Sequence, residues 1–102
     1  MGVEQNFFHE LDRTIEIYEN LVGHVAGRTR AMIARYGAIE ALSRLMVSGD
    51  LQQGFRVLRD KNMLAESFES LVIKFRNQFK PAIVKAAQWR LDNPHDLLGS
   101  RN

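Results

Sequence analysis

The apolar residues of this chain recur at intervals of three and four positions from about residue 4 to residue 91. This spacing gathers them on one side of an α-helix, whereas a half-buried strand would need apolar residues at every second position. Residues that end helices interrupt the pattern at Gly23, Gly27, Gly37, Gly49, Asn62, Pro81 and Pro94. We therefore predict an all-α fold, a compact array of five to six short-to-medium helices with a long amphipathic N-terminal helix.

The first four helices are expected over residues 4–22, 28–36, 38–47 and 51–61. Asn62 tolerates the left-handed backbone that ends a helix, and Ser67 is expected to cap a fifth one. Pro81 suits the first position of a sixth helix, because its missing N–H would have no intrahelical partner there. The apolar residues of this last helix are Ile83, Val84, Ala87, Trp89 and Leu91. Core packing is the default expectation for the aromatic residues of the chain, Trp89 included.

A chain of 102 residues with 45% hydrophobic and 25% charged residues has the composition of one globular domain. We expect this domain to cover residues 1–94 and the polar residues 95–102 to form a loosely ordered tail. A domain of this size buries a modest core, so self-association would be the usual way to cover any apolar surface left over.

The sequence contains no cysteine, which excludes disulfides, thiolate metal sites and cysteine nucleophiles. It also lacks a run of about 20 apolar residues that could span a bilayer, and its N-terminus does not have the pattern of a secretory signal. We expect no membrane association and a cytoplasmic location.

Charge is distributed unevenly along the chain, although the net charge is only +2. Residues 1–27 contain five acidic and one basic residue, and residues 28–61 contain seven basic and three acidic residues. Two interpretations stay open. The acidic and basic parts attract each other, within the fold or between copies, or the basic part binds an anionic partner.

The N-terminal helix is the leading candidate for a contact with another molecule. Its apolar stripe is broad, and we name Phe7, Phe8, Leu11 and Tyr18 as interface candidates. Adjacent helix positions point about 100° apart, so one copy of the chain is not expected to bury both Phe7 and Phe8. Asp12, Glu16 and Glu19 are expected on the opposite, solvated side. The leading hypothesis is a non-enzymatic interaction module that is a homo-oligomer or binds a protein partner.

Catalytic and metal-binding motifs are missing from the sequence. No two of the three histidines have the i+3 or i+4 spacing of helical metal sites, and none belongs to a Glu-x-x-His motif. There is no phosphate-binding glycine loop and no serine in a nucleophile-elbow context. We therefore expect no catalytic residue, no metal site and no cofactor.

The alternative hypothesis is nucleic-acid binding through Arg28, Arg30, Arg35 and Arg44. Arginine forms two parallel hydrogen bonds to phosphate, and Arg28 and Arg30 lie at an expected helix start, which favours anions. The short turns between the helices of residues 28–61 resemble a helix-turn-helix in spacing. The same pattern also suits an ordinary mixed-charge surface, and nucleic-acid binders usually carry a larger positive charge.

Five short motifs carry a resemblance to a known group. They are Thr29-x-x-Met32-Ile33-x-Arg35-Tyr36-Gly37, Ala41-Leu42-x-Arg44-Leu45, Gly54-Phe55-x-x-Leu58, Ser67-Phe68-Glu69-x-Leu71-Val72 and Ala87-x-x-Arg90-Leu91. Together they resemble a small helical domain of uncharacterised bacterial proteins over residues 28–91. The resemblance implies an all-helical fold and a bacterial origin. It implies no catalytic residue, and it does not include the first helix.

Overall fold

The computed structural model of the chain describes residues 2–48 and 52–95. Within them the α-helices are α1 (Gly2–Val22), α2 (Gly27–Tyr36), α3 (Ala38–Val47), α4 (Gln52–Asp60), α5 (Phe68–Lys74) and α6 (Pro81–Asp92). Two short 3₁₀ helices, η2 (Leu64–Glu66) and η3 (Arg76–Gln78), flank α5. The described residues contain no strand, and the predicted all-α fold is confirmed. Gly49 and the tail after residue 95 lie outside the described residues.

The helix ends follow local chemistry that the sequence predicts. Asn62 adopts a left-handed backbone with φ of 60° just after α4. The Ser67 hydroxyl accepts a hydrogen bond from the Ser70 N–H at 3.1 Å, which caps α5. Pro81 occupies the first position of α6, where its fixed φ suits a helix and no intrahelical hydrogen bond is lost.

Gly37 is the only residue between α2 and α3. Its φ of 84° and ψ of 161° lie in a region that is essentially restricted to glycine. Its N–H donates to the Ile33 carbonyl at 2.9 Å, while its own carbonyl accepts from the Ala41 N–H at 2.9 Å. One residue therefore ends α2 and starts α3, and the chain changes direction sharply there.

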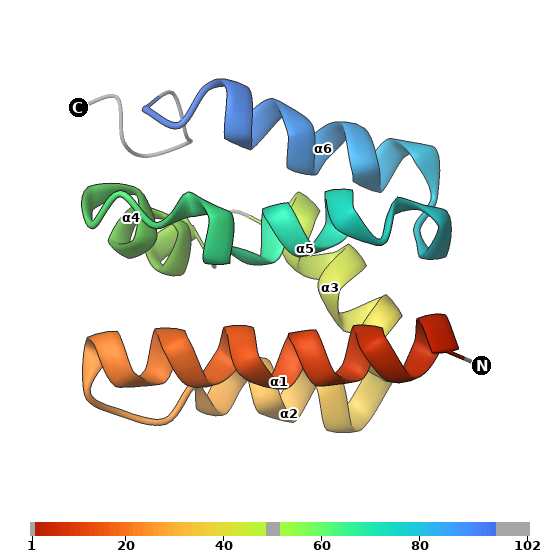
Figure 1. The fold of residues 1–102 in the computed structure, drawn as a ribbon, viewed down its shortest axis with the longest axis horizontal. Helices are drawn as coiled ribbons and strands as arrows, with labels where there is room; N and C mark the ends of the chain where they lie inside the picture. The colour runs from red at the N-terminus through yellow and green to blue at the C-terminus, as the bar shows by residue number, and fades with distance from the viewer. Residues whose placement is uncertain (1, 49–51, 96–102) are drawn as a thin grey trace.

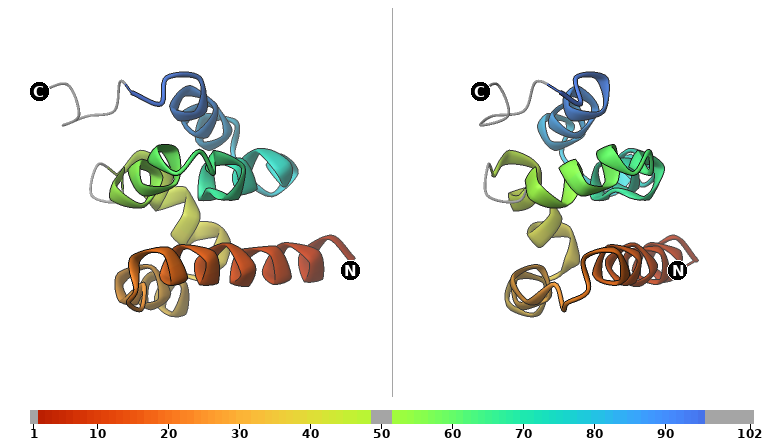
Figure 2. Two further views of the ribbon diagram at one scale, coloured as in Figure 1. Left: turned by 60° about the vertical axis from the view of Figure 1, so that its left-hand side comes forward. Right: turned by 90° about the vertical axis from the view of Figure 1, so that its left-hand side faces the viewer.

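The helices form three tiers (Figure 1), with α1 and α2 in the lower one, α4 and α5 in the middle and α6 at the top. Helix α3 crosses from the lower tier toward the upper ones, and the turned views show the same crossing (Figure 2). Five of its residues, Ala38, Ala41, Leu42, Leu45 and Met46, are buried. Helix α3 is therefore the central element of the core, and only a narrow strip of it reaches solvent.

The prediction that Trp89 faces the core is wrong, because its side chain is 50% exposed. Ala87 and Arg90 are the buried residues of α6. They lie three positions apart and define the inner side of the helix. Trp89 is offset from Arg90 by about 100° and so points toward solvent. Its hydrophobicity suggested an inner position, but the rotation of α6 about its own axis turns Ala87 and Arg90 inward and Trp89 outward.

Candidate interaction surface

The four interface candidates of α1 occupy different environments. Phe7 and Leu11 lie in the protein's own core, with 2% and 3% exposure. The half-buried Tyr18 faces α4, where a Cβ atom on Gly54 would lie 3.4 Å from its ring. Phe8 is 51% exposed. Only Phe8 of the four presents a large apolar surface to solvent, and the expectation that one copy does not bury both phenylalanines is confirmed.

Phe8 belongs to an exposed strip that we call the α1 stripe, formed by Phe8, Asp12 and Glu16. All three are exposed, and their spacing of four residues places them along one side of the helix. The stripe spans eight residues, or about 12 Å of helix axis. It combines one aromatic ring with two carboxylates.

Glu19 does not belong to the solvated acidic side where the sequence placed it. The Arg30 guanidinium donates to both of its carboxylate oxygens, at 2.7 Å and 2.9 Å. The Ala26 N–H donates to Oε2 at 2.7 Å. These donors, Arg30 first and Ala26 second, lower the pKa of Glu19 from 4.5 to about 2. Because α2 returns along α1, Glu19 joins the two helices and is only partly exposed.

Replacing Glu19 by glutamine is expected to destabilise the protein at neutral pH and to have little effect near pH 2. A carboxylate whose pKa is lowered on folding stabilises the native state above its unfolded pKa. That contribution is lost as the pH falls from about 4.5 toward 2. Urea unfolding of wild type and Glu19→Gln at several pH values measures the difference. Glu16→Gln, which changes an exposed acid of the same helix, is the matched control when all proteins are dilute enough to exclude self-association. A Glu19→Gln effect independent of pH would contradict the assignment.

The four arginine candidates do not form one cationic surface. Arg28 and Arg35 are seven residues apart and lie on the same side of α2. Arg30 lies on the side toward α1, where Glu19 occupies its guanidinium. Arg44 stacks over the Tyr36 ring at 4.0 Å and bonds Glu40 at 3.0 Å.

Arg35 approaches the same Tyr36 ring, at 5.4 Å from its centroid. Neither cation–π contact was predicted from the sequence. The contact of Arg35 is local to α2, whereas that of Arg44 depends on the sharp turn at Gly37, which brings α3 beside the end of α2. The structure thus brings together Arg35 and Arg44 but directs Arg30 elsewhere.

A groove of about 370 Å³ runs between the exposed strip of α3 and the start of α6. We call it the α3–α6 groove. Its apolar residues are Ile39, Val47 and Ile83, and its cationic ones are Arg44 and Lys80. Val47 is 68% exposed, so this apolar surface is open to solvent.

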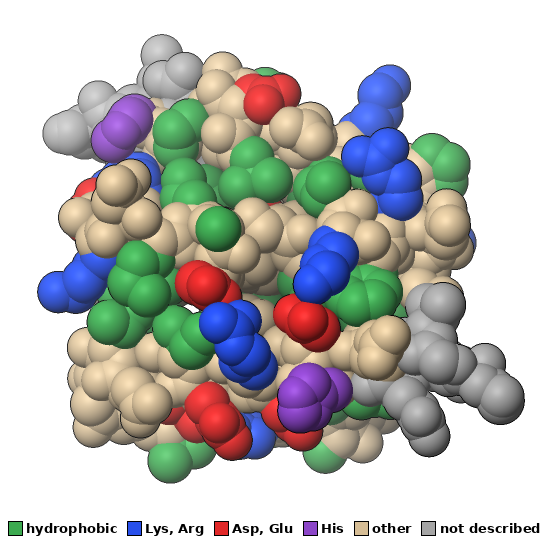
Figure 3. Space-filling view, viewed as in Figure 1, with side chains coloured by type: hydrophobic (Ala, Val, Ile, Leu, Met, Phe, Trp, Pro, Cys, Tyr) green, Lys and Arg blue, Asp and Glu red, His purple; other side chains and the backbone are tan. Residues whose placement is uncertain are grey.

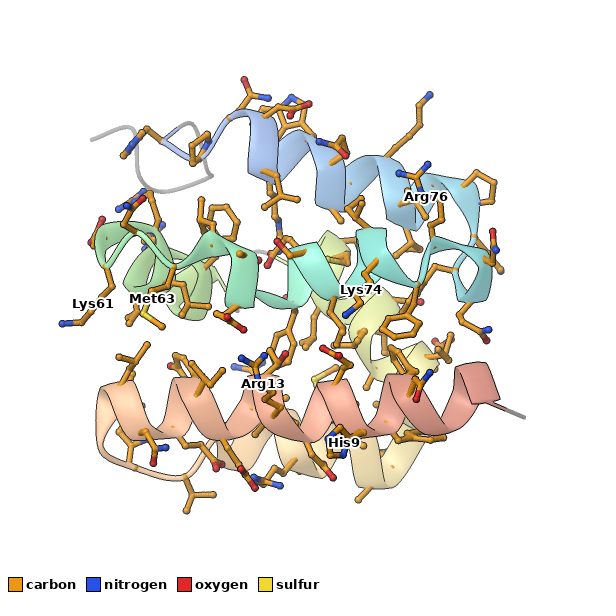
Figure 4. All side chains as sticks on the ribbon, in the orientation of Figure 1. His9, Arg13, Lys61, Met63, Lys74 and Arg76 are labelled. Atoms are coloured by element: carbon orange, nitrogen blue, oxygen red, sulfur yellow. The ribbon has the colours of Figure 1, made fainter. Side chains whose placement is uncertain are left out.

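On the flank of α1 opposite the α1 stripe, ion pairs join the lower tier to the middle tier along a seam between the two. Arg13 bonds Glu66 at 2.9 Å, and Lys74 bonds Glu10 at 3.1 Å. Acidic and basic side chains gather along this seam (Figure 3), and Arg13 and Lys74 reach into it from α1 and α5 (Figure 4). These exposed pairs add little stability individually. They do mean that the charged side chains on this flank of α1 already have partners within the protein.

A buried ion pair between Glu69 and Arg90 joins α5 to α6. The two side chains are 2.8 Å apart, and a second Arg90 nitrogen donates to the Ser48 carbonyl at 2.9 Å, just after α3. Burial raises the pKa of Glu69, although the bond to Arg90 opposes this shift. The sequence suggested only a helix-start role for Glu69. A better signal was helical spacing. Glu69 lies three residues from the buried Val72 on α5, and Arg90 lies three residues from the buried Ala87 on α6, so each charged residue shares the inner side of its helix.

The described residues contain no group of three or more His, Asp or Glu side chains placed to hold a metal ion. None of their helices is long and apolar enough to cross a membrane. No protein-family model matches the chain, and no curated protein and no solved structure shows significant similarity to it. The resemblance of residues 28–91 to a bacterial helical domain therefore stays a prediction.

Proposed function

We propose that the protein is a non-enzymatic helical interaction module that binds a second copy or a protein partner through its N-terminal helix. The observation that carries this proposal is the α1 stripe, in which the exposed Phe8 ring lies beside two carboxylates. Exposed aromatic residues contribute strongly to protein contacts, and neighbouring charges give such contacts direction. The cytoplasmic location favoured by the sequence is part of the same proposal.

The three side chains of the stripe stay exposed on α1, although Asp12 and Glu16 lie within electrostatic range of Arg30 on α2. Phe7 and Leu11 are used by the core, Glu19 is bonded to α2, and Arg13 and Glu10 are paired across the seam with the middle tier. The non-enzymatic part of the proposal rests on the sequence, which lacks motifs for a nucleophile, a phosphate loop or helical metal ligands.

Nucleic-acid binding has weaker support. The four candidate arginines do not form one cationic surface that could follow a phosphate backbone. Arg30 is held by Glu19 at hydrogen-bond distance. Arg44 lines the α3–α6 groove and is paired with Glu40 at 3.0 Å.

Hydroxyl-radical footprinting of the full chain in extract of its source cells tests the proposed function. Phe8 is expected to be oxidised several-fold more slowly in the extract than in dilute purified protein, because a partner covers it. Trp89 is the internal control. Its exposure of 50% is close to the 51% of Phe8, but it lies on α6. Equal oxidation of Phe8 in both samples, or protection of Trp89 alone, would contradict binding through α1.

A further inference from the structure

The α3–α6 groove and the α1 stripe have the same length. Ile39 and Val47 mark the ends of the α3 side of the groove, and they are eight residues apart, as are Phe8 and Glu16. Each spacing corresponds to about 12 Å of helix axis. A helix with the dimensions of the stripe can therefore lie along the whole groove.

The chemistry of the groove calls for an occupant that is apolar at one end and acidic beyond it. Val47 and Ile83 offer apolar surface, which an aromatic side chain would cover favourably. Lys80 lines the groove, and Arg35 lies three residues before the start of α3; neither has an acidic partner among the side chains that the structure describes, those of residues 6–48 and 54–95. The acid in the groove, Glu40, is already bonded to Arg44 at 3.0 Å. The lining of the groove therefore carries a net positive charge, which comes from Lys80.

We propose that the α1 stripe of one copy binds in the α3–α6 groove of a second copy. Val47 lies at the C-terminal end of α3, and Arg35 lies just before its N-terminal end. An antiparallel arrangement of α1 on α3 therefore places Phe8 beside Val47 and the two carboxylates toward Lys80 and Arg35. This inference rests on the proposed function and names its partner and the surface on that partner.

A charge-exchange experiment tests the contact. One variant carries Asp12→Lys and Glu16→Lys, and the other carries Arg35→Glu and Lys80→Glu. Light scattering over a concentration series is expected to show that wild type self-associates and that each variant alone stays monomeric, because stripe and groove then have the same sign of charge. An equimolar mixture is expected to associate again, since each copy then meets a groove or stripe of opposite charge.

Two apolar variants provide a second measurement that leaves the charges unchanged. Phe8→Ser and Val47→Ser are each expected to weaken self-association by about tenfold or more, as loss of a central apolar contact does. Val25→Ser is the matched control, because Val25 is 67% exposed but lies outside both surfaces. Circular dichroism and thermal unfolding confirm that each variant is folded at these exposed positions.

A wild-type chain that stays monomeric at every concentration would overturn the proposal, as would a mixture of the charge variants that does not associate. Equal association of wild type, Phe8→Ser and Val47→Ser would also overturn it. These outcomes do not affect the proposed function if Phe8 is still protected in cell extract, because the partner is then a different protein. Loss of protection in extract would remove the proposed function itself.

Discussion

Replacing Glu69 by alanine is expected to lower the free energy of unfolding by about 3–5 kcal/mol, the usual cost of leaving one member of a buried ion pair without its partner. Arg90 is only 6% exposed and would keep its charge in a site that solvent hardly reaches. Chemical unfolding at neutral pH measures the loss. A decrease of less than about 1 kcal/mol would show that the pair is not buried as described.

Replacing both members of the pair is the matched control. Glu69→Leu combined with Arg90→Met removes both charges and keeps most of the volume, so we expect a stability close to wild type or higher by about 1–4 kcal/mol. A small cavity of about 30 Å³ adjoins both side chains and gives the new residues room to adjust. A double variant as unstable as Glu69→Ala would mean that packing, not charge, determines the effect.

Phe7→Ala is expected to lower the free energy of unfolding by about 3–5 kcal/mol, whereas Phe8→Ala should change it by no more than about 0.5 kcal/mol. Phe7 packs edge-to-face on Phe75 and Phe79, with ring centroids 5.3 Å and 6.0 Å away. Its removal leaves a cavity between α1 and the middle tier. Phe8 has the same chemistry one position along the chain but is half exposed.

Urea unfolding of dilute protein compares the two variants without a contribution from self-association. Light scattering of concentrated protein should then show that Phe8→Ala, which hardly changes stability, is the substitution that reduces association. Equal destabilisation by both substitutions would contradict the orientation of α1.

Much of the fold could be predicted from sequence because its signals are local. The bounds of α3 are those predicted, and Asn62, Ser67 and Pro81 act at helix ends as expected. Each of these signals depends on backbone chemistry within a few residues. The candidate site was predicted less completely, since exposure depends on which helices pack on α1.

The errors have a common physical origin. Trp89 was placed inward because it is hydrophobic, and Glu19 outward because it is charged. In the structure, Arg90 takes the inner position of α6 because a partner on α5 and a carbonyl after α3 satisfy its charge. Glu19 turns toward α2 because two groups there donate to it. In both cases a partner distant in sequence outweighed the preference of the residue itself.

The sequence by itself determined the helices of this protein, because apolar spacing and capping residues act over one or two turns of backbone. It also placed a phenylalanine pair on α1 that a single copy does not bury completely. Only the tertiary structure decided which phenylalanine is exposed, which arginines lie together and which charges are paired inside. Those outcomes depend on the rotation of each helix against its neighbours, which long-range packing sets and local spacing does not record.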